Sequence, residues 1–279
     1  MSRIHIVTDS TSDLRPEVLK SYGVHMVPLS IQIGEKTYLD RIDLEPEPFL
    51  ALMAEAEELP KSSQPAPGVF KELYDELGKD GDQVLSIHMT GGMSGTVESA
   101  RAAAELTDTD VTVIDSRYIS YALTFQVLEA AKMAKEGKTM EEIVAKVDEI
   151  RKNTKLYVVV DTLDNLVKGG RIGKGRALVG SFLKIKPIAS LDDGEYTPVA
   201  KARSHKKVVD WLYEDFIERT KGKTVKGVGF AHANGFAMAE PLRERIVESG
   251  FEDSYFDFTT PVISTHTGIG ALGFMFYTE

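Results

Sequence analysis

The segment M-T-G-G-M-S-G-T at residues 89–96 has the composition of an anion site. It follows a strand-like apolar run and precedes an alanine-rich stretch typical of a helix. Backbone N–H groups and the hydroxyls of Ser94 and Thr96 would therefore gather at a helix start. The segment has no lysine and lacks P-loop spacing, which argues against a nucleotide phosphate as its ligand. A plain glycine-rich turn capped by a hydroxyl is the structural alternative.

His266 is the second candidate ligand-binding residue and lies in T-H-T-G-I-G at 265–270. The neighbouring glycines let the backbone approach a ligand, and an imidazole in this predicted loop could donate a hydrogen bond to an oxyanion. A structural hydrogen bond is the alternative for an isolated histidine. The remaining histidines show no paired ligand spacing and the chain has no cysteine, so we expect no metal site.

A serine hydrolase or esterase is a competing hypothesis for the same residues. Gly92 and Ser94 match part of the nucleophile elbow G-x-S-x-G, and His266 with Asp115 could complete a triad. Thr96 takes the position of the last glycine, where a Cβ atom would crowd the tight turn. This departure favours binding over hydrolysis at Ser94.

Two further segments carry polar chemistry. Ser62 opens S-S-Q-P in a predicted loop, where its hydroxyl could bind a ligand or cap the next helix. Residues 168–186 contain cations and no acidic side chain, with apolar residues such as Phe182 between them. Such an amphipathic segment could lie on an anionic membrane surface, and a core-packed helix with solvated lysines is the alternative. The cations are Lys168, Arg171, Lys174, Arg176, Lys184 and Lys186.

These residues must be positioned by an α/β fold, because strand-like runs alternate with amphipathic helical stretches along the chain. The pattern predicts parallel strands, a hairpin around Gly34, a helix capped by Thr139 and Glu142, and a cap at Asp13. The length of 279 residues fits two α/β domains, which we place at 1–153 and 154–279. The expected strands include 4–7, 84–88, 111–114, 156–160, 187–191, 225–231, 262–264 and 271–277.

Composition restricts the classes of function. A formal net charge of -10 opposes nucleic-acid binding outside a concentrated basic patch, so we expect no nucleic-acid partner. The absence of cysteine is compatible with a reducing compartment, and the first residues lack the pattern of a secretory signal. No apolar run approaches the length of a membrane span. We therefore expect a cytoplasmic protein with no more than peripheral membrane contact.

Taken together and in order, five motifs resemble those of the DegV family, which includes the fatty-acid-binding subunits of bacterial fatty acid kinase. The resemblance covers essentially the whole chain. The motifs are T-D-S-T-S-D-L at 8–14, S-S-Q-P at 62–65, S-G-T at 94–96, L-V-K-G-G-R-I at 166–172 and T-H-T-G-x-G-A-L-G at 265–273.

The resemblance implies two three-layer α/β domains with a lipid tunnel at or near their junction. A long-chain fatty acid of C14 to C18 would be the ligand, and no cofactor is implied. The family positions for its carboxylate fall on Ser62, Ser94 and the amides around Gly95, with His266 nearby. Departures from the pattern, such as Ala66 where relatives often have serine, leave the preferred chain length open.

The resemblance also implies that the protein is not an enzyme by itself. A separate ATP-binding kinase subunit would phosphorylate the bound carboxylate to an acyl phosphate and would dock at Arg203. Arg171, Lys174 and Phe182 match a region that contacts the membrane or opens the tunnel. A scaffold whose lipid is only structural is a further alternative, for which no kinase subunit would co-purify.

Overall fold

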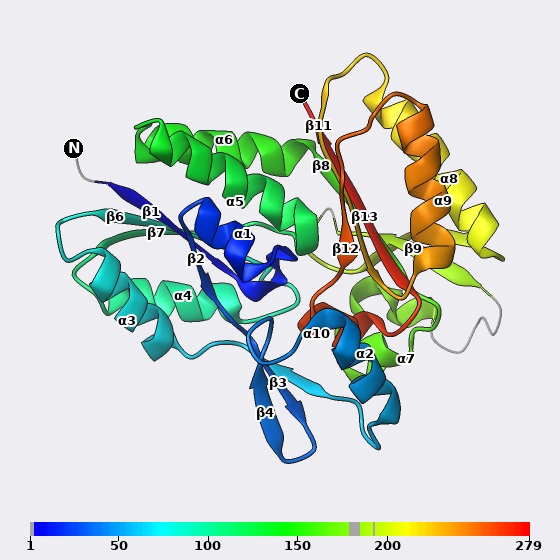
Figure 1. Ribbon diagram of the computed structural model, residues 1–279, viewed down its shortest axis with the longest axis horizontal. Helices are drawn as coiled ribbons and strands as arrows, with labels where there is room; N and C mark the ends of the chain where they lie inside the picture. Colours follow the sequence, from blue (N-terminus) through cyan, green and yellow to red (C-terminus); the bar gives the residue numbers. More distant parts are fainter. Residues whose placement is uncertain (1–2, 179–184, 192) are drawn as a thin grey trace.

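The computed structural model describes residues 3–178, 185–191 and 193–279. A four-stranded parallel sheet of the order β2-β1-β6-β7 forms the first half of the chain (Figure 1). Its strands are buried on both faces, as expected for a parallel sheet between helices. The bounds are β1 Ile4–Asp9, β2 Val24–Val27, β6 Gln83–His88 and β7 Asp110–Asp115.

Helices cover both faces of this sheet. On one face, Phe70 and Tyr74 of α3 and Ala100 of α4 pack against strand residues such as Val84. On the other face, α5 and α6 pack against strand residues such as Leu85. Short helices η1 and α1 follow β1. The bounds are η1 Ser10–Ser12, α1 Pro16–Ser21, α3 Pro67–Leu77, α4 Thr96–Glu105, α5 Ser120–Lys135 and α6 Met140–Asn153.

The second half contains a six-stranded mixed sheet of the order β10-β9-β8-β13-β11-β12. Helices α8 and α9 cover one face (Figure 1), whereas α5 and α6 cover the other and so lie between the two sheets. The fold is therefore α/β with helices on both faces of each main sheet, as predicted. The bounds are β8 Thr154–Val159, β9 Lys186–Ser190, β10 Thr197–Ala202, α8 His205–Thr220, β11 Val225–Ala233, α9 Phe236–Glu248, β12 Tyr255–Phe258 and β13 Ala271–Thr278.

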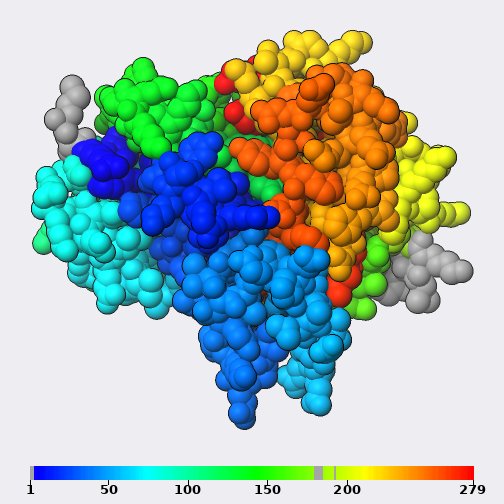
Figure 2. All heavy atoms as spheres, in the orientation of Figure 1, coloured from blue at the N-terminus to red at the C-terminus, as the bar shows by residue number. Residues whose placement is uncertain are grey.

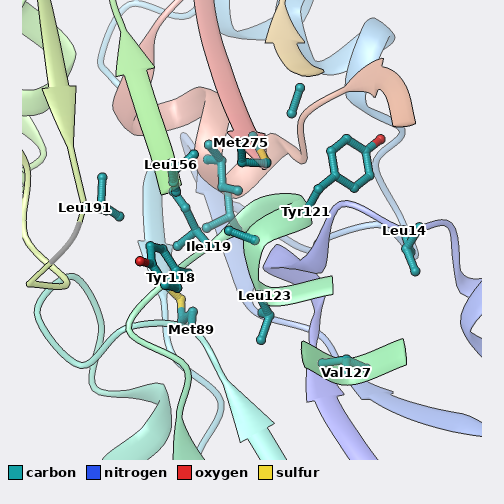
Figure 3. Close-up of a cluster of buried hydrophobic side chains, with 14 of the residues drawn as sticks. Leu14, Met89, Tyr118, Ile119, Tyr121, Leu123, Val127, Leu156, Leu191 and Met275 are labelled. Carbon is teal, nitrogen blue, oxygen red and sulfur yellow. The ribbon is translucent and has the colours of Figure 1, made fainter. Parts of the chain in front are cut away.

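One hydrophobic cluster joins the two halves. Figure 3 shows Tyr118 and Ile119, which directly precede α5, and Leu123 of α5 near Leu156 of β8 and Met275 of β13. The predicted domain boundary falls where α6 ends and β8 begins, at residues 153 and 154. The division into two domains stays a prediction, because this cluster crosses it. The capping box of Thr139 and Glu142 at the start of α6 is confirmed.

A small antiparallel sheet of the order β4-β3-β5 projects from the body of the protein (Figures 1 and 2). It contains the predicted hairpin, β3 Ser30–Ile33 and β4 Lys36–Leu39, with Gly34 at φ 59° in its turn. The third strand, β5 Lys61–Ser63, corrects the prediction that Ser62 lies in a loop, because Ser62 pairs with Ile31. Helix α2, Pro46–Glu55, connects the hairpin to β5.

His266 lies in a helix and not in the predicted loop. The residues predicted as a strand at 262–264 belong to α10, Pro261–Thr267. Pro261 favours the first helical turn through its fixed φ, and Gly268 ends the helix at φ 78°. His266 therefore stands in the last turn, where the helix fixes its direction.

The basic segment is described only in part. Helix α7, Asp164–Lys168, and the short 3-10 helix η2, Gly173–Leu178, precede residues 179–184, which include Phe182 and lie outside the described residues. The described part of the predicted basic amphipathic helix is not one helix, because the non-helical residues 169–172 separate α7 from η2. Among the described residues, no helix combines the length and apolar character that a membrane span requires.

Candidate functional site

A cavity of about 320 Å³ lies between the first half of the chain, the small sheet and α10. Its polar wall brings together residues far apart in sequence, namely Ser62, Ser94 and His266. The remaining wall is mostly apolar and includes Met89 and Ile119, which Figure 3 shows within the buried hydrophobic cluster. The lining residues are Leu29, Ser62, Ser63, Gln64, Met89, Met93, Ser94, Ile119, Val158, Leu166, Arg171, Tyr196, Val262, Ile263, His266 and Thr267.

Ser62 and His266 form a hydrogen-bonded pair in this wall. Strand β5 presents the Ser62 hydroxyl and α10 presents the imidazole, and Oγ lies 2.7 Å from Nε2. Ser62 can accept from Nε2–H while its own O–H donates to a ligand oxygen. In this arrangement the imidazole orients the Ser62 hydroxyl so that it can donate a hydrogen bond to an anion.

The His266 imidazole is neutral at pH 7. Burial and the positive charge of Arg171 lower its pKa to about 4. Its Nδ1 atom is buried without a hydrogen-bond partner. A Cβ atom added to Gly169, at the end of α7, would lie 2.3 Å from that Nδ1, so the ring packs directly against the backbone there.

Ser94 lies in the loop that leads into α4, as predicted. Its Oγ hydrogen-bonds to Thr96 Oγ1 at 2.9 Å and accepts from the N–H of Thr96 at 3.3 Å. Gly95 is the N-cap residue of α4, and a Cβ atom there would lie 2.1 Å from the Gln64 side-chain oxygen. Gln64 donates to Ser99 Oγ at 2.9 Å, which holds the S-S-Q-P segment against α4. This contact sets the spacing between the Ser62 and Ser94 segments.

Arg171 brings a positive charge to the cavity wall. Its Nε donates to the carbonyl oxygen of Met93 at 3.0 Å, and Nη1 donates to that of Gly169 at 2.6 Å. The side chain thus connects the loop before Ser94 with the end of α7. A carboxylate in the cavity would be attracted by this charge.

The apolar part of the cavity continues toward a second, smaller cavity of about 20 Å³. The two share Ile119, Val158, Ile263 and Thr267 as lining residues. Beyond them, the smaller cavity is lined partly by small residues of the six-stranded sheet, such as Ala231 and Gly273. A nonpolar chain that enters at the hydroxyls could extend in this direction.

A second Ser-His-Asp arrangement is sealed inside the first half of the chain. Asp9 Oδ2 lies 3.0 Å from His88 Nδ1, and His88 Nε2 lies 2.7 Å from Ser86 Oγ, which also accepts from Tyr74. Asp9, Ser86 and His88 are fully buried and line neither cavity. Asp9 also accepts from the N–H of Met89 at 2.9 Å, so the network fixes the start of the loop that carries Ser94.

The geometry of His266 argues against a serine hydrolase. Its Nε2 pairs with Ser62, and no side chain of the described residues orients Nδ1 as a triad acid would. Asp115 accepts instead from the N–H groups of Gly91 and Arg117. Within the described ranges, no group of three or more histidine or acidic residues is arranged to hold a metal ion.

Comparison with known proteins identifies the family. The family model described as "Uncharacterised protein, DegV family" matches residues 3–279. A DegV domain-containing protein of Staphylococcus aureus is 43% identical over 274 residues, which are 98% of each chain. The chain belongs to the DegV family.

Solved DegV structures share this fold. A structure entitled "Fatty Acid Binding of a DegV family Protein from Thermus thermophilus" matches with a TM-score of 0.94 and 32% identity, over 99% of this chain and 100% of that one. The Streptococcus pneumoniae Fatty Acid Kinase (Fak) B3 protein loaded with linoleic acid matches with a TM-score of 0.85 and 25% identity, over 100% of both chains. The predicted DegV-like fold is thereby confirmed.

The DegV motifs meet at the cavity to different degrees. Ser62, Ser94 and His266 line it, and Gly95 lies one residue beyond Ser94. Arg171, predicted as a gating or membrane residue, lines the same cavity, whereas exposed Lys174 approaches Asp193 at 3.5 Å. Arg203 is exposed in the bend between β10 and α8 and does not line the cavity. The roles predicted for all these residues stay predictions.

Several cavity residues were missed in the sequence. Gln64 belongs to the S-S-Q-P motif, so its neighbour Ser62 already indicated a polar site there. For Tyr196 the sequence contained no such signal, because this residue lies on the connection between β9 and β10. Only the structure shows that its ring packs beside Gly175 and lines the cavity. Leu29 and Val262 are apolar residues like many others in the core.

Proposed function

We propose that this protein binds a long-chain fatty acid, with its carboxylate at Ser62, Ser94 and the amides near Gly95 and its tail in the apolar cavity. The observation that carries this proposal is the Ser62–His266 pair at 2.7 Å in the wall of a mostly apolar cavity. Solved relatives are described as fatty-acid-binding proteins, which supports the same ligand class.

The tail supplies the affinity. Burying some 16 methylenes at roughly 0.8 kcal/mol each gives a driving force on the order of 10 kcal/mol. A buried carboxylate without partners would cost much of this gain. The Ser62 and Ser94 hydroxyls and the charge of Arg171 offset that cost at one end of the cavity.

The neutral His266 imidazole suits a carboxylate ligand. Because burial and Arg171 lower the pKa of His266 to about 4, the ring carries no charge at pH 7. It can donate from Nε2 to Ser62, whose hydroxyl then donates to the carboxylate. The carboxylate thus receives a hydrogen bond from Ser62, and a second oxygen stays available for reaction.

The finer proposal is that a separate kinase subunit phosphorylates the bound fatty acid. A carboxylate oxygen attacks the γ-phosphorus of ATP held by the partner, ADP leaves, and the acyl phosphate stays with this protein. The description of one relative as the Fak B3 protein supports this step. Exposed Arg203 is the proposed docking residue, and Arg171, Lys174 and Phe182 the proposed gating or membrane-contact residues.

Ligand binding is tested by native mass spectrometry and palmitate titration of the purified protein. We expect a co-purified C14 to C18 acid, and a loss of palmitate affinity of about tenfold for Ser62→Ala or Ser94→Ala, since each removes one donor to a charged group. Ser21→Ala, an exposed serine on α1, is the control. A ligand-free protein that does not bind added palmitate would falsify the proposal.

Kinase docking has its own test. With the kinase subunit, ATP and bound palmitate, Arg203→Ala should slow ADP formation while palmitate affinity is unchanged. Lys206→Ala, a nearby exposed cation, should leave the rate unaltered. Equal rates for both variants and the wild type remove Arg203 from the docking surface.

A further inference from the structure

Three buried charged residues, Asp13, Asp40 and Arg41, lie together beside the cavity wall. They are 1%, 0% and 4% exposed, and none of them lines the cavity. Two buried carboxylates with one guanidinium cost free energy unless each group is hydrogen-bonded. The partners of these groups therefore show what the cluster holds in place.

Asp40 connects two walls of the cavity. Its N–H donates to the carbonyl oxygen of Leu29 at 2.9 Å. Its carboxylate accepts from Thr260 Oγ1 at 3.0 Å and from the N–H of Val262 at 3.3 Å. Leu29 and Val262 both line the cavity, so the side chain and backbone of one buried residue hold two parts of its wall.

The start of α10 depends on these contacts. Thr260 is the N-cap residue of α10, but its hydroxyl makes no cap hydrogen bond and turns to Asp40 instead. The Asp40 carboxylate takes over the cap by accepting from the N–H of Val262. The helix that carries His266 therefore begins at a position set by the loop after β4.

Asp13 strengthens the same attachment. Its carboxylate accepts from Thr259 Oγ1 at 3.0 Å, from the N–H of Thr260 at 2.7 Å and from the hydroxyl of Ser120. This corrects the expectation that Asp13 caps the following helix, whose N-cap residue is Arg15. Asp13 instead joins α5 to the segment that precedes α10.

The backbone at this cluster is strained. Asp13, Arg41 and Ser120 have φ of 62°, 64° and 60°, a left-handed conformation that costs free energy for residues other than glycine. Such conformations persist where surrounding contacts determine them, and they gather at functional sites. Arg41 donates to the carbonyl oxygens of Asp13 at 2.8 Å and Phe258 at 3.3 Å, which supplies part of that restraint.

We propose that Asp40 is a positioning residue that holds α10 where His266 can pair with Ser62 and where Val262 closes the cavity against Leu29. The inference rests on the proposed binding of a fatty acid at this site. Asp40 does not touch the ligand and acts through α10.

The main test compares Asp40→Ala with Asp40→Asn. Alanine leaves the Val262 N–H and the Thr260 hydroxyl without their acceptor, so palmitate affinity should fall about tenfold. Asparagine keeps an acceptor for Val262 and an amide that can donate to Thr260 Oγ1, so it should restore most of the affinity. Asp80→Ala, an exposed aspartate in the turn after α3, should match the wild type.

A second pair of variants tests the same proposal if Asp40→Ala fails to fold. Thr260→Val keeps the shape but removes the hydroxyl, and should weaken palmitate binding severalfold. Thr260→Ser keeps the hydroxyl and should bind as the wild type does. All affinities are measured well below each variant's Tm.

The nuclear magnetic resonance signals of the His266 imidazole nitrogens provide a measurement that does not need the ligand. They should shift in Asp40→Ala and Thr260→Val, because α10 sets the position of the ring relative to Ser62, and should stay unchanged in Asp80→Ala. Wild-type affinity together with an unchanged His266 signal in both variants overturns the inference. If the wild type itself binds no palmitate, the proposed function fails, and the His266 signals still test the role of Asp40.

Discussion

At the level of single residues, His266 shows how packing sets chemistry. Its Nε2 is committed to Ser62, and its Nδ1 faces the backbone at Gly169 without a partner. Burial keeps the ring neutral, so it acts through orientation and hydrogen bonding. Small changes in the atoms that support the ring should therefore change ligand binding without changing any ligand-contacting residue.

Gly169→Ala tests this dependence. The added Cβ atom would lie 2.3 Å from Nδ1, so the ring must move away from Ser62 or α7 must shift. We expect palmitate affinity to fall about tenfold, in the range of overpacking effects. Gly68→Ala in α3, where nothing lies within 4 Å of the added atom, is the matched control. Equal affinity for the two variants would contradict this dependence of binding on the atoms that support the ring.

Asp40 should also make stability depend on pH. Burial raises its pKa to about 7, and that of Asp13 to about 6, well above the usual range of an aspartate. The folded state then binds protons more tightly than the unfolded state between about pH 4 and pH 7. The free energy of unfolding should therefore fall as pH rises through this window, by an amount on the order of a few kcal/mol.

Denaturant titrations of the wild type and Asp40→Asn from pH 5 to pH 8 measure this dependence. Asparagine cannot ionise, so the variant should lose stability less steeply over the range. The slopes should differ by up to one proton per molecule. Parallel curves would place the titration of Asp40 outside this window.

At the level of elements, the site is formed by short segments at the ends of larger ones. Strand β5 and helix α10 carry Ser62 and His266, which are 204 positions apart in sequence. The sequence motifs identified both residues as polar candidates, yet nothing local indicated that they pair. Ser62 was expected in a loop because serine and proline dominate its surroundings, whereas pairing of β5 with β3 overrides that local preference.

The same limit explains the error at α10. The run at 262–264 is apolar and β-branched enough to predict a strand. Pro261 and Gly268 are compatible with a helix, but a helix of seven residues has little periodicity to detect. The carboxylates of Asp13 and Asp40, distant in sequence, accept hydrogen bonds from backbone N–H groups at its start. Helix propensity calculated from neighbouring residues does not include such contacts.

The strands β11 and β13 should set the preferred chain length of the ligand. Ala231 and Gly273 lie opposite each other on these strands and line the small cavity of about 20 Å³. Ala231→Val would fill this space. Stearate affinity should fall about tenfold relative to myristate, because roughly 0.8 kcal/mol is lost for each displaced methylene.

Competition titrations with the two acids give this ratio directly. Ala239→Val in α9, a buried site in another hydrophobic cluster, controls for general loss of stability. An unaltered stearate-to-myristate ratio in Ala231→Val would mean that the tail ends elsewhere.

At the level of the whole molecule, helices α5 and α6 lie between the two main sheets and contribute to both hydrophobic faces. The alternation of strands and helices was sufficient to predict the α/β class and most elements. It did not reveal this shared layer, because periodicity shows that a helix has an apolar face but not which sheet it covers.

The shared layer predicts cooperative unfolding. Trp211, the single tryptophan, packs edge-on against Tyr157 with ring centroids 5.3 Å apart and reports on the second half of the chain. Far-UV circular dichroism reports on both halves. We expect Trp211 fluorescence and far-UV circular dichroism to give the same midpoint of urea unfolding, because one hydrophobic cluster holds the two sheets together. Separate midpoints would favour independent domains at 1–153 and 154–279.

One buried hydrogen-bond network has the residue order of a hydrolytic triad, namely Asp9, His88 and Ser86. All three side chains are fully buried. A template search that scores only interatomic distances would assign esterase chemistry to this chain on that basis. Solvent and substrate access separates such look-alikes from working catalysts. Any functional assignment from side-chain geometry should therefore require an open route to the nucleophile.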